Sequence, residues 1–293
     1  MIFLIPPACT VVRHISKSLP RALAILAVVW LNWGSVARAE QPALRIGGTG
    51  ATLGTMRLLT AAFEKTGPGL HVQVLPSLGS TGGIRAVNAK AIDIGVTARL
   101  LTDAERANGS VALEFARIPL VLAVLGPVGV TGITKAQLID IYAGRMSQWP
   151  DGSSIRLVLR PATDINTITL KELSPQMRDA VTAADKRQGM LLALTEQQAI
   201  ENLLKIPNSI GPATLSEILT SELQLKALRL DGVEPSATTV ADGSYPLFLR
   251  LSLVTLGKPS AIAQRFIAFM QSEPGRRILI ETGHLLPGQA GIH

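Results

Sequence analysis

The sequence has 293 residues, of which 47% are hydrophobic and 17% are charged, and its formal net charge is +7. This composition excludes an intrinsically disordered chain, because enough apolar side chains are present to build a large core. The length exceeds one average domain and suits two lobes of roughly 100–150 residues each.

The first 39 residues have the pattern of a secretory signal peptide. Three basic residues precede an unbroken apolar run, residues 22–31, which is shorter than the about 20 residues that span a bilayer. Ala37-Arg38-Ala39 then forms an A-x-A cleavage site. We predict cleavage after Ala39, export to the periplasm and a soluble product. An uncleaved anchor helix is the alternative.

Removing this segment changes the charge of the protein. It carries four basic residues and no acidic one, so 24 of the 28 basic residues remain beside 21 acidic ones, a net charge of +3. No run of Lys and Arg follows, so we expect no nucleic-acid partner. The only cysteine, Cys9, lies in the removed segment, which leaves the mature chain without thiol chemistry or disulfides. We expect a monomer.

The first elements repeat one unit. Strand 44–47 is followed by a glycine-rich turn and a helix, and strand 71–75 is followed by a second glycine turn, 79–83, and a second helix. A third strand is expected over residues 92–96. Two such units in succession predict βαβ topology and a largely parallel sheet. The inward-facing helical residues are expected to be Met56, Leu59 and Phe63, then Ile84, Val87 and Ala91.

Strands and helices continue to alternate in the rest of the chain. A buried strand is expected over 118–125, interrupted early by Pro119, and the pattern restarts after Gly126-Pro127. Further strands are expected over 155–159, 225–230 and 247–256. Ser209-Ile210-Gly211 is interpreted as a tight passage between two helices. Helix starts are predicted at five capping residues, Thr102, Thr134, Ser174, Thr195 and Thr214.

Enzyme signatures are missing. The chain has no H-E-x-x-H and no G-x-S-x-G, and residues 47–54 lack the Gly-Lys-Ser/Thr end of a P-loop. Gly48-x-Gly50-x-x-x-Gly54 places its last glycine one position too late for the dinucleotide fingerprint. His71 and His284 show no pairing pattern. We therefore predict no enzyme, no cofactor and no metal site.

Two turns rich in Gly, Ser and Thr each open a helix, where free backbone N–H groups bind anions. Their hydroxyl donors are Thr49, Thr52, Ser80 and Thr81. Arg160, at a strand end before a third polar turn, adds a planar fork that suits oxyanions. The alternative is ordinary helix capping by Ser and Thr. Two glycine turns together with an arginine favour an anion site.

The order of the motifs is also informative. They are Gly48-Thr49-Gly50-Ala51-Thr52-Leu53, residues 78–84, 93–99 with 101–105, 118–124, 138–144 with Trp149, 231–236 and 243–247. Together, across residues 44–288, they resemble the periplasmic phosphate-binding protein of ABC transporters, within the type 2 periplasmic binding superfamily. The resemblance implies an α/β fold of two lobes, a Venus flytrap, with a mostly parallel sheet in each lobe and two crossovers.

Function and partners are also implied by the resemblance. The expected protein closes on a small oxyanion, phosphate, and delivers it to an ABC transporter permease in the inner membrane. A different oxyanion, such as sulfate, molybdate or tungstate, and a periplasmic sensor or adaptor without transport are the alternatives. Lobe I is expected to hold residues 42–122 and 247–290, and lobe II residues 123–246.

The resemblance also assigns site residues. Thr52, Ser80, Arg160 and the backbone N–H of Leu53 match ligand positions, whereas the family's aspartate, which accepts the phosphate proton, falls on Ala98. The third loop reads Thr163-Asp164-Ile165-Asn166 in place of Gly-Ser-Gly-Thr. Asp164 is expected either to take over as proton acceptor or to cap its helix and point away from the cleft. The predicted ligand residues are Thr49, Thr52, Leu53, Ser80, Thr81, Gly82, Arg160, Asp164, Asn166 and Thr167.

Overall fold

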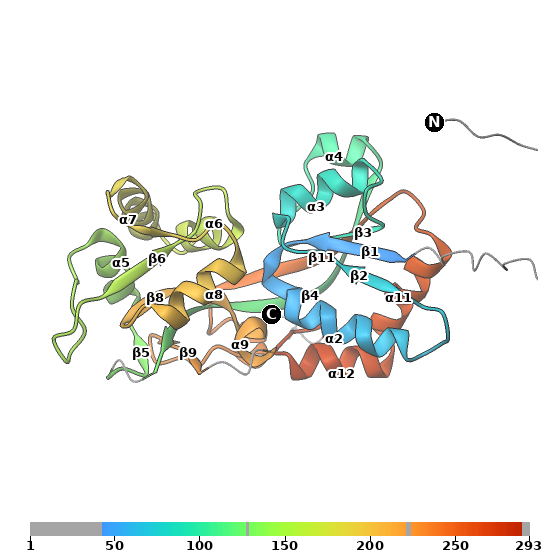
Figure 1. Ribbon diagram of the computed structural model, residues 1–293. Helices are drawn as coiled ribbons and strands as arrows, with labels where there is room; N and C mark the ends of the chain where they lie inside the picture. Colours follow the sequence, from blue (N-terminus) through green and yellow to red (C-terminus); the bar gives the residue numbers. More distant parts are fainter. Residues whose placement is uncertain (1–42, 127–128, 221–223, 289–293) are drawn as a thin grey trace, which may run out of the picture. The chain divides into compact units, whose positions relative to one another are not determined.

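The computed structural model describes residues 43–126, 129–220 and 224–288. Residues 41–293 form one compact unit, whose described part is an α/β fold with two lobes joined through long strands (Figure 1). The predicted signal peptide, residues 1–39, lies outside the described residues. Among the described residues, no helix combines the length and the apolar character that crossing a bilayer requires.

The first lobe is built on the predicted βαβ units. Strands β1 (Leu44–Gly48), β2 (Val72–Val74) and β3 (Ile94–Thr97) are parallel, with β1 in the middle. The return strand β11 (Phe248–Leu256) pairs antiparallel with β3 and with β4 (Ser110–Leu125). The parallel arrangement of the first three strands confirms the topology that the repeated strand–turn–helix pattern predicts.

Strand β4 belongs to both lobes. Its first part, from Ser110 to Pro119, pairs with β11, and its second part pairs with β8 (Ser209–Thr214) and β9 (Leu225–Ala227). The expectation of a strand that begins at residue 118 is therefore wrong by eight residues. Pro119, which has no backbone N–H to donate, lies where β4 exchanges one set of partners for the other.

The second lobe continues the same sheet. Strand β6 (Arg156–Leu159) is parallel to β8 and to β7 (Leu191–Leu192), whereas β5 (Gly132–Ile133) and β10 (Arg229–Leu230) form a separate two-stranded sheet. The interpretation of Ser209-Ile210-Gly211 as a tight passage is wrong, because these residues begin a fully buried strand, β8. A short, completely buried strand has no alternation that would distinguish it from a turn.

Helices cover both faces of the first-lobe sheet. In Figure 1, α3 and α4 lie on one side of β1, β2 and β3, whereas α2, α11 and α12 lie on the other. The first-lobe helices are η2 (Gly50–Thr52), α2 (Leu53–Glu64), α3 (Gly79–Asn88), α4 (Asp103–Ala107), α11 (Ala261–Gln271) and α12 (Glu273–Glu281). The remaining helices are α5 (Lys135–Ala143), α6 (Ile165–Glu172), α7 (Pro175–Lys186), α8 (Glu196–Lys205), α9 (Leu215–Thr220) and α10 (Ala237–Ala241).

Most predicted helix starts are confirmed by the cap geometry. Thr102 and Thr134 form capping boxes, and Ser174 and Thr195 accept a backbone N–H of their helices. The start at Thr214 is also confirmed, since α9 begins at Leu215, but the Thr214 hydroxyl donates to the carbonyl of Ala51 at 2.8 Å.

Ala91 is a correction. Helix α3 ends at Asn88, Lys90 takes a left-handed conformation with φ 56°, and Ala91 is exposed. The inward face of α3 therefore consists of Ile84 and Val87, as predicted, without Ala91.

The close packing of α3 on β1 depends on Gly83. A Cβ atom at this position would lie 2.7 Å from the Cα of Gly48, which is backbone and cannot move aside. We expect Gly83→Ala to lower the free energy of unfolding by about 1–3 kcal/mol, the usual effect of overpacking. Urea denaturation measures it. Gly67→Ala is the control, because its nearest atoms would be 3.6 Å away. Equal effects of the two substitutions would contradict the prediction.

Candidate functional site

The candidate site is a cleft of about 490 Å³ between loops of the two lobes. On the first lobe it is lined by residues 49–51, 77–82 and Arg99, and on the second by Arg160, residues around the start of α6, and residues 194–196. These loops follow the carboxyl ends of β1, β2, β3 and β6. Open α/β sheets bind their ligands at this edge, where side chains from neighbouring strands converge.

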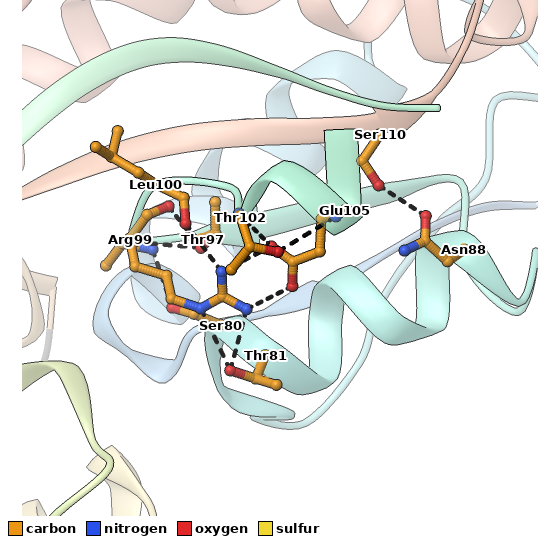
Figure 2. Close-up of polar contacts among 10 residues, drawn as sticks. Ser80, Thr81, Asn88, Thr97, Arg99, Leu100, Thr102, Glu105 and Ser110 are labelled. Atoms are coloured by element: carbon orange, nitrogen blue, oxygen red, sulfur yellow. Dashed lines mark hydrogen bonds and ion pairs between the residues drawn. The ribbon is translucent and has the colours of Figure 1, made fainter. Parts of the chain in front are cut away.

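The first turn of α3 offers hydroxyl groups to the cleft. Ser80 Oγ accepts the backbone N–H of Ala98 at 3.0 Å, and Thr81 Oγ1 accepts Nε and Nη2 of Arg99 at 3.3 and 3.2 Å (Figure 2). These bonds use only the acceptor capacity of the two hydroxyls. Each hydroxyl therefore keeps its proton for a bond to an acceptor in the cleft, which is what an oxyanion provides.

Arg99 orients this turn and is itself neutralised. Its guanidinium forms a two-pronged pair with Glu105, with Nη1–Oε2 at 2.9 Å and Nη2–Oε1 at 2.7 Å (Figure 2). The hydrogen bond from Arg99 lowers the pKa of Glu105 to about 2, and the bond with Glu105 raises the pKa of Arg99. Sequence reasoning did not select Arg99, although it follows the end of β3 as Arg160 follows the end of β6.

The Arg99–Glu105 pair should make the free energy of unfolding depend on pH in the acid range. The Glu105 pKa of about 2 lies below its unfolded value, so the stabilisation is complete above the unfolded pKa, near pH 4.3, and is lost as pH falls toward 2. Glu105→Gln keeps a side chain that can close the cap with Thr102 but does not titrate. We expect urea unfolding to show a smaller loss of stability between pH 6 and pH 3 in this variant than in wild type. Parallel losses would contradict the assignment.

Arg160 is 5% exposed and is held at the end of β6. Its Nη1 donates to the carbonyl of Ala193 at 2.8 Å, and its Nη2 forms a salt bridge with Asp164 Oδ2 at 2.6 Å. The third nitrogen of the guanidinium, Nε, is buried and has no hydrogen-bond partner among the described residues. A buried guanidinium N–H without an acceptor is unfavourable, and an anion in the cleft would provide one.

Asp164 both caps α6 and lines the cleft. Its Oδ1 accepts the backbone N–H of Asn166 at 3.0 Å while its Oδ2 accepts Arg160. The capping alternative therefore holds in part, but the expectation that a capping Asp164 points away from the cleft is wrong. The Asp164 carboxylate stays at the cleft because it bonds to Nη2 of Arg160 while it caps the helix. A role as acceptor of a ligand proton stays a prediction.

Three predicted ligand residues do not line the cleft. Thr52 is completely buried, the backbone N–H of Leu53 bonds to the carbonyl of Gly50, and Thr167 Oγ1 donates to the carbonyl of Arg160 at 3.1 Å. Thr167 thus stabilises the backbone of Arg160 without lining the cleft. The cleft is lined by the other predicted residues, which are Thr49, Ser80, Thr81, Gly82, Arg160, Asp164 and Asn166.

Glu196 is a cleft residue that sequence reasoning missed. It is 2% exposed, and its carboxylate accepts the N–H of Thr214 at 3.1 Å and Nδ2 of Asn166 at 2.9 Å. Burial raises the pKa of Glu196 to about 7; Arg160 opposes the shift, whereas Glu217 and Asp164 add to it. In the sequence, Glu196 directly follows the cap residue Thr195, where acidic residues are common, so nothing there marks it as a cleft residue.

The chemistry of the lining is that of an anion site. Donor groups converge from both lobes, and the described residues contain no group of three or more His, Cys, Asp or Glu side chains placed to hold a metal ion. The positive charges of Arg99 and Arg160 are each matched by a carboxylate. Recognition in such a cleft depends on hydrogen-bond donors more than on excess positive charge.

Known proteins are similar to this chain in sequence and in fold. A family model described as the PBP superfamily domain matches residues 35–274. The phosphate-binding protein PstS of Bacillus subtilis is 26% identical over 264 residues, covering 86% of this chain and 83% of that protein. A Clostridium perfringens substrate-binding protein solved with phosphate bound superposes with a TM-score of 0.70 at 21% identity, covering 83% of this chain and 99% of that chain. An ABC-type phosphate transport receptor from Vibrio cholerae gives a TM-score of 0.59 at 22% identity, with 83% and 100% covered.

Proposed function

Since this chain belongs to the family of the PBP superfamily domain, we propose that it is a periplasmic solute-binding protein that captures phosphate for an ABC transporter. One observation carries the proposal. Arg160 lines the cleft and has a buried Nε without an acceptor within the described protein, and the hydroxyl protons of Ser80 and Thr81 have no acceptor there either. A tetrahedral oxyanion has several acceptor oxygens and would satisfy donors from both lobes at once. The names of the relatives support phosphate within this class.

A capture role fits better than catalysis. The polar groups of the cleft are hydrogen-bond donors and carboxylates, and no histidine is among the lining residues to act as a base. Binding proteins work by closing on a ligand, which stabilises the closed form that a permease recognises. We therefore infer a binding protein without enzymatic activity that acts as a monomer and is exported after cleavage following Ala39. N-terminal sequencing of the exported protein tests the cleavage after Ala39.

We infer the lobe boundaries from the strand pairing. Lobe I would comprise residues 42–122 and 247–290, and lobe II residues 123–246. The exchange of partners along β4 supports this division, as does the pairing of β11 with β3. Closure of two such lobes on a ligand would make the protein more compact. Small-angle scattering should show a smaller radius of gyration with phosphate than without it.

A ligand panel tests the proposed function. Phosphate at 100 times its dissociation constant is expected to add about 2.7 kcal/mol to the free energy of unfolding, because it binds only the folded state. Thermal shift measurements with phosphate, sulfate, molybdate and tungstate rank the oxyanions, and calorimetry gives the affinities. Stronger stabilisation by another oxyanion would redirect the proposal to that ligand. No response to any of the four would contradict an anion-binding function.

A further inference from the structure

Glu196 lies at the seam between the two lobes. It is the first residue of α8, and the Cβ that Gly50 lacks would lie 2.8 Å from the Cβ of Glu196. Its two oxygens are held by the backbone of Thr214 and the side chain of Asn166, both in the second lobe. A carboxyl group is thus fixed against the first-lobe loop and lines the space that the proposed anion would occupy.

Glu196 is the unmatched charge of the cleft. Four charged residues line it, and three of them are already paired: Arg99 with Glu105, which lies behind the lining, and Arg160 with Asp164. Three charged groups act on Glu196, namely Arg160 at the end of β6, Asp164 at the cap of α6 and Glu217 on α9. Glu217 accepts the N–H of Gly54 at 3.1 Å. Among the described residues, Arg160 is the one cation that acts on Glu196, and Asp164 already neutralises it.

The hydrogen bonds around Glu196 can accommodate a proton. Asn166 Nδ2 donates to the Glu196 carboxylate, while Asn166 Oδ1 is buried without a partner among the described residues. If the carboxyl group is protonated, rotation of the amide by half a turn lets Oδ1 accept the new O–H. The rotation turns Nδ2, a donor, toward the position that Oδ1 now occupies. Protonation therefore removes a negative charge, while the hydrogen bond between Glu196 and Asn166 is kept with its direction reversed.

We propose that the cleft binds its oxyanion together with one proton, which is held on Glu196. This inference rests on the proposed function and identifies Glu196 as a residue that determines which charge state the site accepts. An anion that enters beside an ionised, buried carboxylate is repelled strongly, since water screens two neighbouring charges poorly in the interior of a protein. Uptake of a proton by Glu196 removes this repulsion.

The pH dependence follows by linkage. Burial places the pKa of Glu196 near 7 in the free protein, and a bound anion raises it further. Well below that value Glu196 already carries its proton, and binding takes up none. Above it, binding takes up a proton, so affinity falls as pH rises, by as much as tenfold for each pH unit. Replacement of Glu196 by Gln removes this dependence because Gln does not titrate.

Calorimetry in two buffers of different ionisation enthalpy counts the protons. Phosphate is titrated into wild type and Glu196→Gln at pH 6 and pH 8, and the protonation of phosphate itself contributes equally to both proteins. At pH 8, wild type is expected to take up close to one proton more than Glu196→Gln. The difference should shrink at pH 6. Glu217→Gln removes a half-buried carboxyl that does not line the cleft, and this control should keep the uptake.

Equal proton counts for wild type and Glu196→Gln at pH 8 would overturn the inference while leaving phosphate binding intact. Absence of phosphate binding by wild type would instead overturn the proposed function and this inference with it. Infrared difference spectroscopy gives a second readout that needs only wild type. Addition of phosphate at pH 8 should produce the carbonyl band of a protonated carboxyl group, and a spectrum without this band would contradict proton uptake by the protein.

Discussion

Arg160→Ala is expected to weaken phosphate binding at least about 30-fold. Truncating one partner of a buried, hydrogen-bonded charge pair costs about 2–5 kcal/mol, and 1.4 kcal/mol corresponds to a tenfold change in affinity. Two effects add in this variant. The unpartnered Nε donor is lost, and the carboxylate of Asp164 is left without its cation in the cleft. Isothermal titration calorimetry with phosphate measures the change.

A matched ion pair elsewhere in the chain provides the control. Arg145 and Asp140 are joined at 2.6 Å, as Arg160 and Asp164 are, but the Arg145 side chain is 63% exposed and lies outside the cleft. Arg145→Ala should leave phosphate affinity unchanged. Arg160→Lys keeps a positive charge without the planar fork and should lie between wild type and Arg160→Ala. If Arg160→Ala binds phosphate as wild type does, the guanidinium is not part of the site.

The sequence predicts the parts of the site that depend on local pattern. Arg160 follows a hydrophobic strand and precedes a polar turn, and both features can be recognised within ten residues. Ser80 and Thr81 stand between glycines at a helix start. In each case the rule that parallel strands place their carboxyl ends at one edge is enough to bring the residues together. The described cleft is lined by all three of these residues.

Other parts of the site depend on contacts that no local pattern contains. Glu196 reaches the cleft because α8 packs where residues far apart in sequence meet, and its partner Thr214 is 18 residues away. Thr52 and Thr167 each follow a lining residue directly, yet the rotation between successive residues of a helix points them away from the cleft. Spacing in sequence does not determine that rotation to within one residue.

The same limit applies to the fold. The first eight residues of β4, Ser110 to Arg117, include four consecutive exposed residues and have the burial pattern of neither a buried strand nor an alternating one, so only the segment from Ile118 onward has a recognisable signal. Pairing with β11, which is more than 100 residues later in the chain, holds this exposed part in the sheet. Tertiary pairing of this kind overrides weak local preference.

Asp164→Asn is expected to shift selectivity toward sulfate, lowering the ratio of phosphate to sulfate affinity at least about tenfold. The carboxylate lines the cleft and repels any anion, most strongly one that carries no proton. A like charge about 4 Å away at the effective dielectric of a protein surface is worth about 4 kcal/mol before further screening, which leaves ample room for a tenfold change. Removing a repulsive element relaxes discrimination.

The substitution leaves the rest of the loop in place. The amide oxygen of Asn can still accept the N–H of Asn166, and Asn is as good a helix cap as Asp. Asp140→Asn, in the matched exposed pair with Arg145, is the control and should change neither affinity. Calorimetry below neutral pH measures the affinities for both ligands, because phosphate then carries protons that Asp164 could accept, whereas sulfate carries none. If Asp164 accepts a proton of the ligand, phosphate affinity falls while sulfate affinity rises. If Asp164 only caps α6 and neutralises Arg160, both affinities rise by the same factor, and an unchanged ratio would rule out Asp164 as the acceptor.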